Sequence, residues 1–97
     1  MAVKAIFKDD VKTITPKLYK VILLNDDYTT FDFVIEILKT IFHKNEEEAI
    51  NITLKVDRDG SAGVGVYPYE IAQIKVEKTH TLARSAGFPL RARIEEV

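Results

Sequence analysis

Cysteine is absent from this chain of 97 residues. Its absence excludes disulfide bonds, thiolate metal sites and cysteine nucleophiles, and it fits a reducing compartment. No apolar segment approaches the roughly 20 residues that a helix needs to span a membrane. The N-terminus also lacks the apolar stretch of a secretory signal. From these absences we expect a cytoplasmic protein.

A large excess of charge of either sign is also lacking. The formal net charge of -1 gives no general attraction to nucleic acids or to acidic membranes, and the basic residues do not cluster with aromatic residues as they do in nucleic-acid interfaces. The hydrophobic content of 46% and the charged content of 30% are those of an ordinary globular protein. The length suffices for one domain with a modest core. We therefore predict a single domain that binds neither nucleic acid nor membrane.

The most informative segment is YKVILLNDDYTTF, at residues 19–31. Its apolar run, residues 21–24, is too short for a helix and rich in branched side chains, which predicts a buried strand. Thr29 and Asp32 have the spacing of a capping box, so a helix should begin near Thr30.

Between this strand and this helix lies an acidic corner, formed by Asn25, Asp26 and Asp27. Packing of the flanking elements should hold the corner rigid. A rigid corner can bind a small cationic group without the entropy cost of ordering a loop first.

The rest of the chain alternates between helical and extended patterns. Asn45, followed by three glutamates, predicts the N-cap of a second helix that ends near Val56. Alternation over residues 62–67 predicts a strand whose two glycines lie on one face, which indicates either close packing or a weak strand. A third helix should run over 69–86 after Pro68 and end at Gly87, and a strand should follow at 90–95.

The predicted order is strand, helix, helix, strand, helix, strand. This order predicts an α+β fold: one small domain with a three-stranded antiparallel sheet and three helices packed on one face. The core domain should span residues 18–97. Residues 1–17 are weakly patterned and predict a flexible N-terminal extension, or alternatively an arm that a partner grips.

The residues that could carry out chemistry are few. Asp26 and Asp27 could form a catalytic pair, but adjacent side chains usually point in different directions, and no nucleophile or set of metal ligands accompanies them. His43 and His80 are isolated, as surface or packing residues would be. The segment from Asp57 to Gly60 has its glycine at the wrong position for a calcium loop. A binding module is therefore favoured over an enzyme, with no metal and no cofactor.

The segment YKVILLNDDYT, at residues 19–29, closely resembles the signature of ClpS, the N-end rule adaptor family of the Clp protease. The resemblance runs from Tyr19 to the C-terminus and leaves residues 1–18 outside. Its further matches are Phe33-Val34, the Gly60 turn, Glu70-Ile71-Ala72, Lys75-Val76, Ala83-Arg84 and Pro89-Leu90.

What the resemblance implies is an adaptor, not an enzyme. Such an adaptor binds the free α-amino group and the bulky apolar side chain of an N-terminal Phe, Tyr, Trp or Leu. It delivers these N-degron substrates to a ClpA-type AAA+ unfoldase, whose N-terminal domain it contacts. We expect a monomer whose N-terminal extension is engaged by the unfoldase pore.

The resemblance also assigns roles to individual residues. The substrate α-amino group would be recognised by Asn25, Asp26, Asp27, Thr29 and Asp57. The hydrophobic pocket would be lined by Phe31, Val34, Thr53, Val56 and Leu90. The unfoldase would be contacted by Glu70 and Lys75, whose spacing of five residues does not favour an intrahelical salt bridge and leaves both charged groups free for a partner.

Three pocket positions depart from the family pattern. Asp57 stands where the family has a histidine that accepts a hydrogen bond from the substrate amine; Asp57 could accept that bond, pair with Arg58, or face water. Phe31 stands where a methionine is common. Thr53 stands where a methionine usually guards the pocket against β-branched residues. We therefore predict altered discrimination, with N-terminal Ile or Val tolerated.

Two other hypotheses are compatible with the residues alone. One is a generic protein-interaction module whose acidic corner is purely structural and binds no N-degron. The other is a small enzyme that uses Asp26 or Asp27. Acetylation of a Phe-initiated peptide separates them, because only the adaptor depends on the ammonium group.

Overall fold

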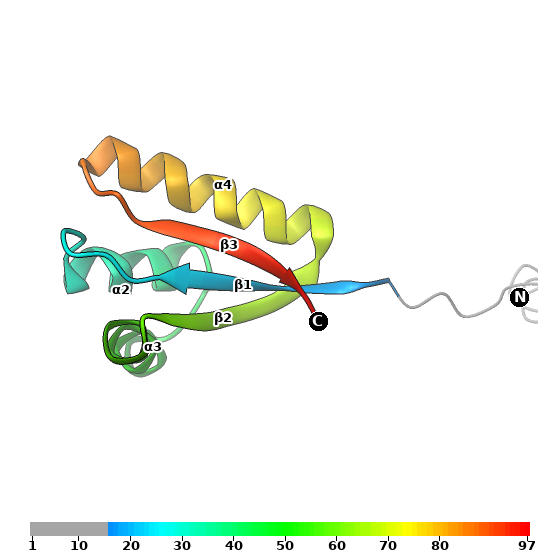
Figure 1. Ribbon diagram of the computed structural model, residues 1–97, viewed down its shortest axis with the longest axis horizontal. Helices are drawn as coiled ribbons and strands as arrows, with labels where there is room; N and C mark the ends of the chain where they lie inside the picture. The colour runs from blue at the N-terminus through cyan, green and yellow to red at the C-terminus, as the bar shows by residue number, and fades with distance from the viewer. Residues whose placement is uncertain (1–15) are drawn as a thin grey trace, which may run out of the picture.

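The computed structural model describes residues 16–97, so most of the predicted extension lies outside the described residues. It contains three strands and three helices in the predicted order (Figure 1). The elements are β1 (Leu18–Leu24), α2 (Phe31–Thr40), α3 (Glu46–Asp59), β2 (Ser61–Pro68), α4 (Tyr69–Ala86) and β3 (Arg91–Glu96). The sheet has the order β2-β1-β3 and is antiparallel throughout. The predicted α+β fold is thereby confirmed.

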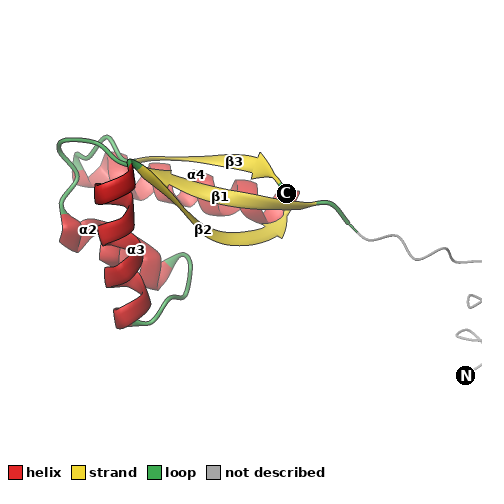
Figure 2. Ribbon diagram, turned by 60° about the horizontal axis from the view of Figure 1, so that its bottom comes forward, coloured by secondary structure: helices red, strands yellow, loops and turns green. Residues whose placement is uncertain are grey.

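One hydrophobic core joins the sheet to all three helices. Val21 and Leu23 of the central strand are fully buried, and they share one cluster of buried residues with Ile37 of α2, Val56 of α3 and Ala83 of α4. Figure 2 shows α4 running behind the sheet, while α2 and α3 lie at the end where β1 stops. Because β1 is central and apolar over this stretch, its end is held in place on both sides. Among residues 16–97, no helix is both long enough and apolar enough to cross a bilayer.

Helix α2 begins where the sequence predicted, but with a different cap. Thr30 is the N-cap, and its hydroxyl accepts a hydrogen bond from the backbone N–H of Phe33 at 3.2 Å. The predicted capping box of Thr29 and Asp32 is wrong, because the Thr29 hydroxyl donates to Asp26 instead. Thr29 therefore belongs to the corner and not to the helix.

Helix α3 begins at the predicted cap and runs past its predicted end. The side chain of Asn45 accepts from the Glu48 N–H, and the Glu48 side chain accepts from the Asn45 N–H, which completes a capping box. Gly60 ends the helix in the left-handed region at φ 88°. This longer helix carries Asp57 in its last turn.

Strand β2 contains a bulge that the alternating pattern did not predict. Ile22 pairs with Gly63 while the preceding Val21 pairs with Gly65, so Val64 is an extra residue. Because successive residues of β1 face opposite sides, the two glycines also face opposite sides, and the prediction that they share one face is wrong. A Cβ at Gly65 would lie 2.3 Å from the Tyr67 hydroxyl, so this glycine makes room for that ring.

A histidine links α4 to the outer edge of the sheet. The backbone N–H of Ala92 in β3 donates to His80 Nε2 at 3.0 Å. Burial lowers the pKa of His80, and the nearby positive charges of Arg91 and Arg84 lower it further. The hydrogen bond requires an unprotonated Nε2, so the fold prefers neutral His80, which confirms a packing role for this residue.

We expect the free energy of unfolding to fall as the pH is lowered through about 6.5, the ordinary histidine pKa. Because the pKa of His80 is lower in the folded state, the unfolded chain takes up the proton first as the pH falls. Protonation therefore favours the unfolded state, and the contribution of His80 to the free energy of unfolding, complete above about pH 7, is lost at lower pH. Urea unfolding between pH 7.5 and 5.5, above the range where most carboxylates titrate, measures the effect. His80→Gln, which can still accept from Ala92, should flatten the profile, whereas His43→Gln on the exposed surface should retain it. If the free energy of unfolding of His80→Gln falls with pH as steeply as that of the wild type, His80 is not the group responsible.

Candidate functional site

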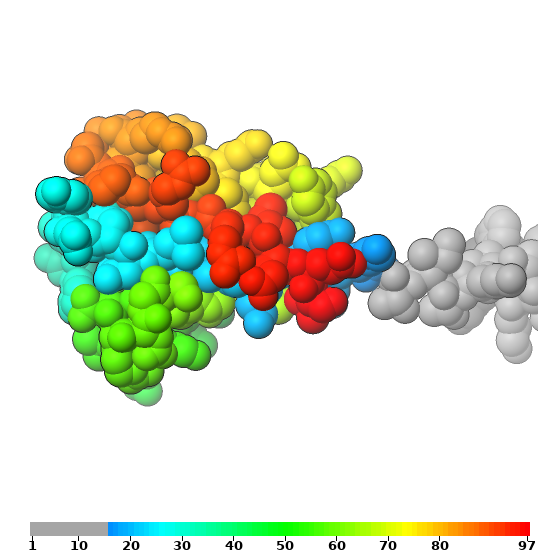
Figure 3. All heavy atoms as spheres, in the orientation of Figure 1, coloured from blue at the N-terminus to red at the C-terminus, as the bar shows by residue number. Residues whose placement is uncertain are grey.

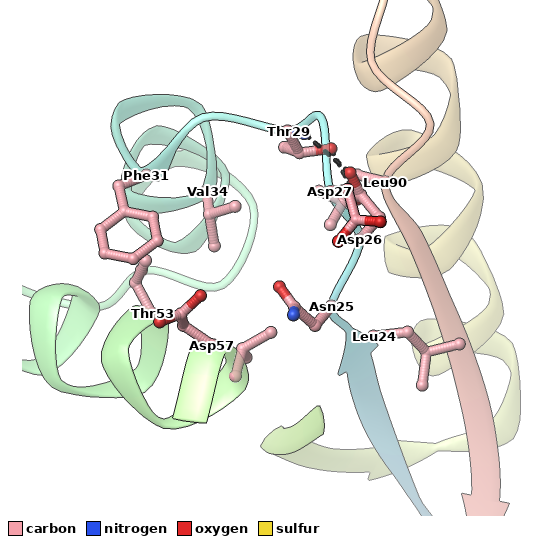
Figure 4. Close-up of a pocket in the computed structure, with 11 residues that line it drawn as sticks. Leu24, Asn25, Asp26, Asp27, Thr29, Phe31, Val34, Thr53, Asp57 and Leu90 are labelled. Carbon is pink, nitrogen blue, oxygen red and sulfur yellow. Dashed lines mark hydrogen bonds between the residues drawn. The ribbon is translucent and has the colours of Figure 1, made fainter. Parts of the chain in front are cut away.

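A pocket of about 280 Å³ lies between the end of β1, the start of α2, the last turns of α3 and the residue before β3 (Figure 4). In Figure 3 the corresponding segments, coloured cyan, green and orange, meet at one end of the molecule. The pocket is lined by Leu24, Asn25, Asp26, Asp27, Thr29, Phe31, Val34, Thr53, Val56, Asp57 and Leu90. Every residue predicted for amine recognition or for the hydrophobic pocket is therefore in one place. Leu24 is an addition; as the last residue before the corner, it could have been included from the sequence.

The acidic corner is ordered by its own hydrogen bonds. The Asp26 carboxylate accepts from the N–H groups of Tyr28 at 2.8 Å and Thr29 at 2.7 Å, and from the Thr29 hydroxyl at 2.7 Å. Burial by itself raises the pKa of Asp26, but the three hydrogen bonds outweigh burial and hold the pKa below its usual value. Asp26 and Thr29 thus hold the corner in shape.

The corner is also tied to α3. The backbone N–H of Asn25 donates to the carbonyl of Gly60 at 2.9 Å. This bond sets Asn25 across from Asp57 in the last turn of α3, as Figure 4 shows. Two distant parts of the chain therefore form one polar wall of the pocket.

The polar wall carries acceptors that the protein itself does not use. Within residues 16–97, the side chains of Asn25, Asp27 and Asp57 accept no hydrogen bond, and the three residues are exposed. The alternative in which Asp57 pairs with Arg58 is wrong, because Arg58 binds Asp59 instead, at 2.9 Å. Together these side chains offer an amide oxygen and two carboxylates to a cation.

The opposite wall is formed mainly by buried apolar side chains. Val34, Val56 and Leu90 are each at most 6% exposed. Thr53 is equally buried, and its hydroxyl donates to the Ala49 carbonyl at 2.7 Å, so it requires no polar partner in the pocket. Phe31 lies at the rim with 46% of its surface exposed. The pocket is thus suited to a ligand whose positive charge sits beside an apolar group.

The two residues predicted to contact the unfoldase lie on α4, away from this pocket. Glu70 is exposed in the first turn. Lys75 is not free, contrary to the expectation from its spacing: its ammonium donates to the Ile41 carbonyl at 2.7 Å and lies 5.1 Å from the centre of the Tyr67 ring. Burial, and then the charge of Lys78, lower the pKa of Lys75. Lys75 therefore binds the carbonyl at the end of α2.

Comparison with known proteins gives consistent matches over most of the chain. Residues 14–93 match the family described as ATP-dependent Clp protease adaptor protein ClpS. The ATP-dependent Clp protease adapter protein ClpS of Nautilia profundicola is 79% identical over 97 residues, which is 100% of both chains. The protein of the same name from Wolinella succinogenes is 48% identical over 89 residues, covering 92% of this chain and 87% of that protein.

A solved structure agrees with both the sequence matches and the fold. It is Agrobacterium tumefaciens ClpS2 bound to L-phenylalaninamide. The TM-score is 0.83 at 42% sequence identity, and the match covers 86% of this chain and 100% of that chain.

Proposed function

Because the chain belongs to the ClpS family of Clp protease adaptors and is not an enzyme, we propose that its pocket captures the N-terminal residue of substrate proteins. The preferred residues are Phe, Tyr, Trp and Leu, and the captured protein is handed to a ClpA-type AAA+ unfoldase. The observation that carries this proposal is the junction of two walls in one pocket: unused acceptors on Asn25, Asp27 and Asp57 face a buried apolar surface.

The polar wall is matched to an α-ammonium group. Such a group carries one positive charge and three N–H donors, and the wall offers an amide oxygen and two carboxylates. Hydrogen bonds to charged groups contribute roughly 1.5–3 kcal/mol each. Since the Asp26 bonds already order the corner, little entropy is lost there on binding.

The apolar wall is matched to a large side chain. Burying an aromatic side chain removes about 150–250 Å² from water, which is ~4–6 kcal/mol gross at ~25 cal/mol/Å². Association costs of comparable size oppose this gain, so neither wall alone should bind usefully. The molecule bound to the related ClpS2, L-phenylalaninamide, carries both required groups: a free amine and a benzyl side chain.

Degradation of a reporter tests the whole proposal. With a ClpA-type unfoldase, its peptidase and ATP, a folded reporter that begins with Phe should be degraded much faster when this chain is added. The same reporter beginning with Ser is the control and should gain nothing. If this chain accelerates the degradation of both reporters equally, or of neither reporter, the proposed role is contradicted.

We expect an Ile-initiated peptide to bind within about tenfold of its Leu-initiated counterpart. Thr53 is short and lies in the buried wall, so it leaves space for a methyl group branching at the substrate Cβ, even with Phe31 at the rim. Thr53→Met should fill this space and weaken Ile binding selectively, since overpacking a tight site costs about 1–3 kcal/mol. Calorimetric titration with Phe, Leu, Ile and Val peptides measures the ranking. An Ile peptide with no detectable affinity would refute the prediction.

A further inference from the structure

The mouth of the pocket has two unlike sides. One side is the polar corner at the end of β1. On the other side, Phe31 lines the pocket with 46% of its surface exposed, and Ile50 of α3, just outside the lining residues, is 38% exposed. We call these two residues the apolar lip.

Helical spacing places Ile50 on the side of α3 that faces the pocket. Ile50 precedes Thr53 by three residues and Asp57 by seven, and residues at these spacings share one face of a helix. Both Thr53 and Asp57 line the pocket. Figure 4 shows Phe31 on α2 beside Thr53 on α3. The apolar lip therefore continues the apolar wall outward, beyond the opening.

The position of a bound N-terminal residue decides what reaches this lip. Its ammonium is held at the polar wall and its side chain lies inside the pocket, so its carbonyl must leave through the mouth. The next Cα follows at about 3.8 Å. The second residue of the substrate must therefore lie at the mouth, within reach of one side or the other.

We propose that the side chain of the second substrate residue packs on the apolar lip, so that this adaptor prefers an apolar residue at the second position. This inference rests on the proposed function and adds a second subsite to it. The bound ammonium takes up the acceptors of Asp27 and Asp57 and offsets one of their two negative charges, and the Asp26 carboxylate is already engaged by the corner. The lip, in contrast, stays exposed to water unless the second residue covers it, which favours a large apolar side chain at that position.

Peptides that differ only at the second position test the subsite. Phe-Leu, Phe-Ala, Phe-Lys and Phe-Asp peptides, labelled at the C-terminus, are titrated by fluorescence anisotropy. We expect Phe-Leu to bind about five- to tenfold more tightly than Phe-Ala, from partial burial of the added carbon atoms. In Ile50→Ser the ratio of the two affinities should fall to about half of the wild-type ratio or less, because only Phe31 of the lip remains. Leu82→Ser is the matched control, because Leu82 is 45% exposed on α4, and this variant should keep the wild-type ratio.

The outcomes separate this inference from the function on which it rests. Equal affinities for all four peptides, or tightest binding by Phe-Lys, would overturn the apolar subsite while leaving N-terminal capture intact. An unchanged preference in Ile50→Ser would also overturn it. If none of the four peptides binds, the proposed function itself fails.

Discussion

A Phe-initiated peptide that carries an N-terminal acetyl group should bind at least about 100-fold more weakly than the same peptide with a free amine. Acetylation removes the positive charge and two of the three donors, while the acceptors of Asn25, Asp27 and Asp57 would still lose their water. Loss of two charged hydrogen bonds at roughly 1.5–3 kcal/mol each accounts for a factor of this size. Anisotropy titration with a label at the C-terminus gives both affinities under identical conditions.

A peptide whose N-terminal Phe is N-methylated serves as the control for acetylation. It keeps the positive charge and two donors, so its affinity should lie between those of the free and the acetylated peptides. Equal binding of all three peptides would support a generic interaction module whose acidic corner is purely structural, and it would rule out recognition of the ammonium group.

Asp57→Ala should weaken binding of a Phe-initiated peptide by about ten- to thirtyfold, with Asp57→Asn less affected. The carboxylate lies in the last turn of α3, across from Asn25, without a partner among residues 16–97. A charged hydrogen bond of roughly 1.5–3 kcal/mol corresponds to a factor of about 10 to 150, and because Asp57 is exposed to water we expect the lower end of this range. Since a negative charge near a helix C-terminus is unfavourable, the substitution should not lower the free energy of unfolding. Affinity and urea unfolding are therefore measured together.

Asp59→Ala is the matched control for Asp57→Ala. It removes the same charge two residues further along, from a carboxylate that pairs with Arg58 and does not line the pocket. Its effect on peptide affinity should be less than about threefold, because exposed charges outside a site contribute little. If both variants bind like the wild type, Asp57 only faces water.

Local signals predicted the elements that have strong boundaries of their own. Pro68 and Gly87 bracket α4 at the predicted positions, and Asn45 caps α3 as its sequence indicated. The sequence does not distinguish Thr29 from Thr30 as the cap of α2, because both are good caps and the choice between them depends on the Asp26 carboxylate.

Features that depend on distant partners could not be predicted from one segment. The bulge at Val64 arises from register with β1, which the alternation within β2 does not reveal. The spacing of Glu70 and Lys75 predicts a free Lys75, but the carbonyl that Lys75 binds belongs to Ile41 at the end of another helix.

The pocket also combines residues that a local sequence pattern indicates with residues that no local pattern indicates. Asn25 and Asp27 are evident from the corner itself, where an apolar strand stops at polar residues. Val56 and Leu90 lie far along the chain, and only the family resemblance assigns them to the pocket, because nothing in their own segments indicates a cavity.

The bond between the Asn25 N–H and the Gly60 carbonyl has a consequence for fragments of the chain. A synthetic peptide copied from residues 19–45 would contain the acidic side chains but neither the carbonyl that anchors them nor the opposite wall. Such a peptide should not bind the ligand. Because the site exists only in the folded domain, the ligand should be released in the same cooperative transition in which the domain unfolds, and thermal unfolding curves followed by circular dichroism and by ligand release should coincide.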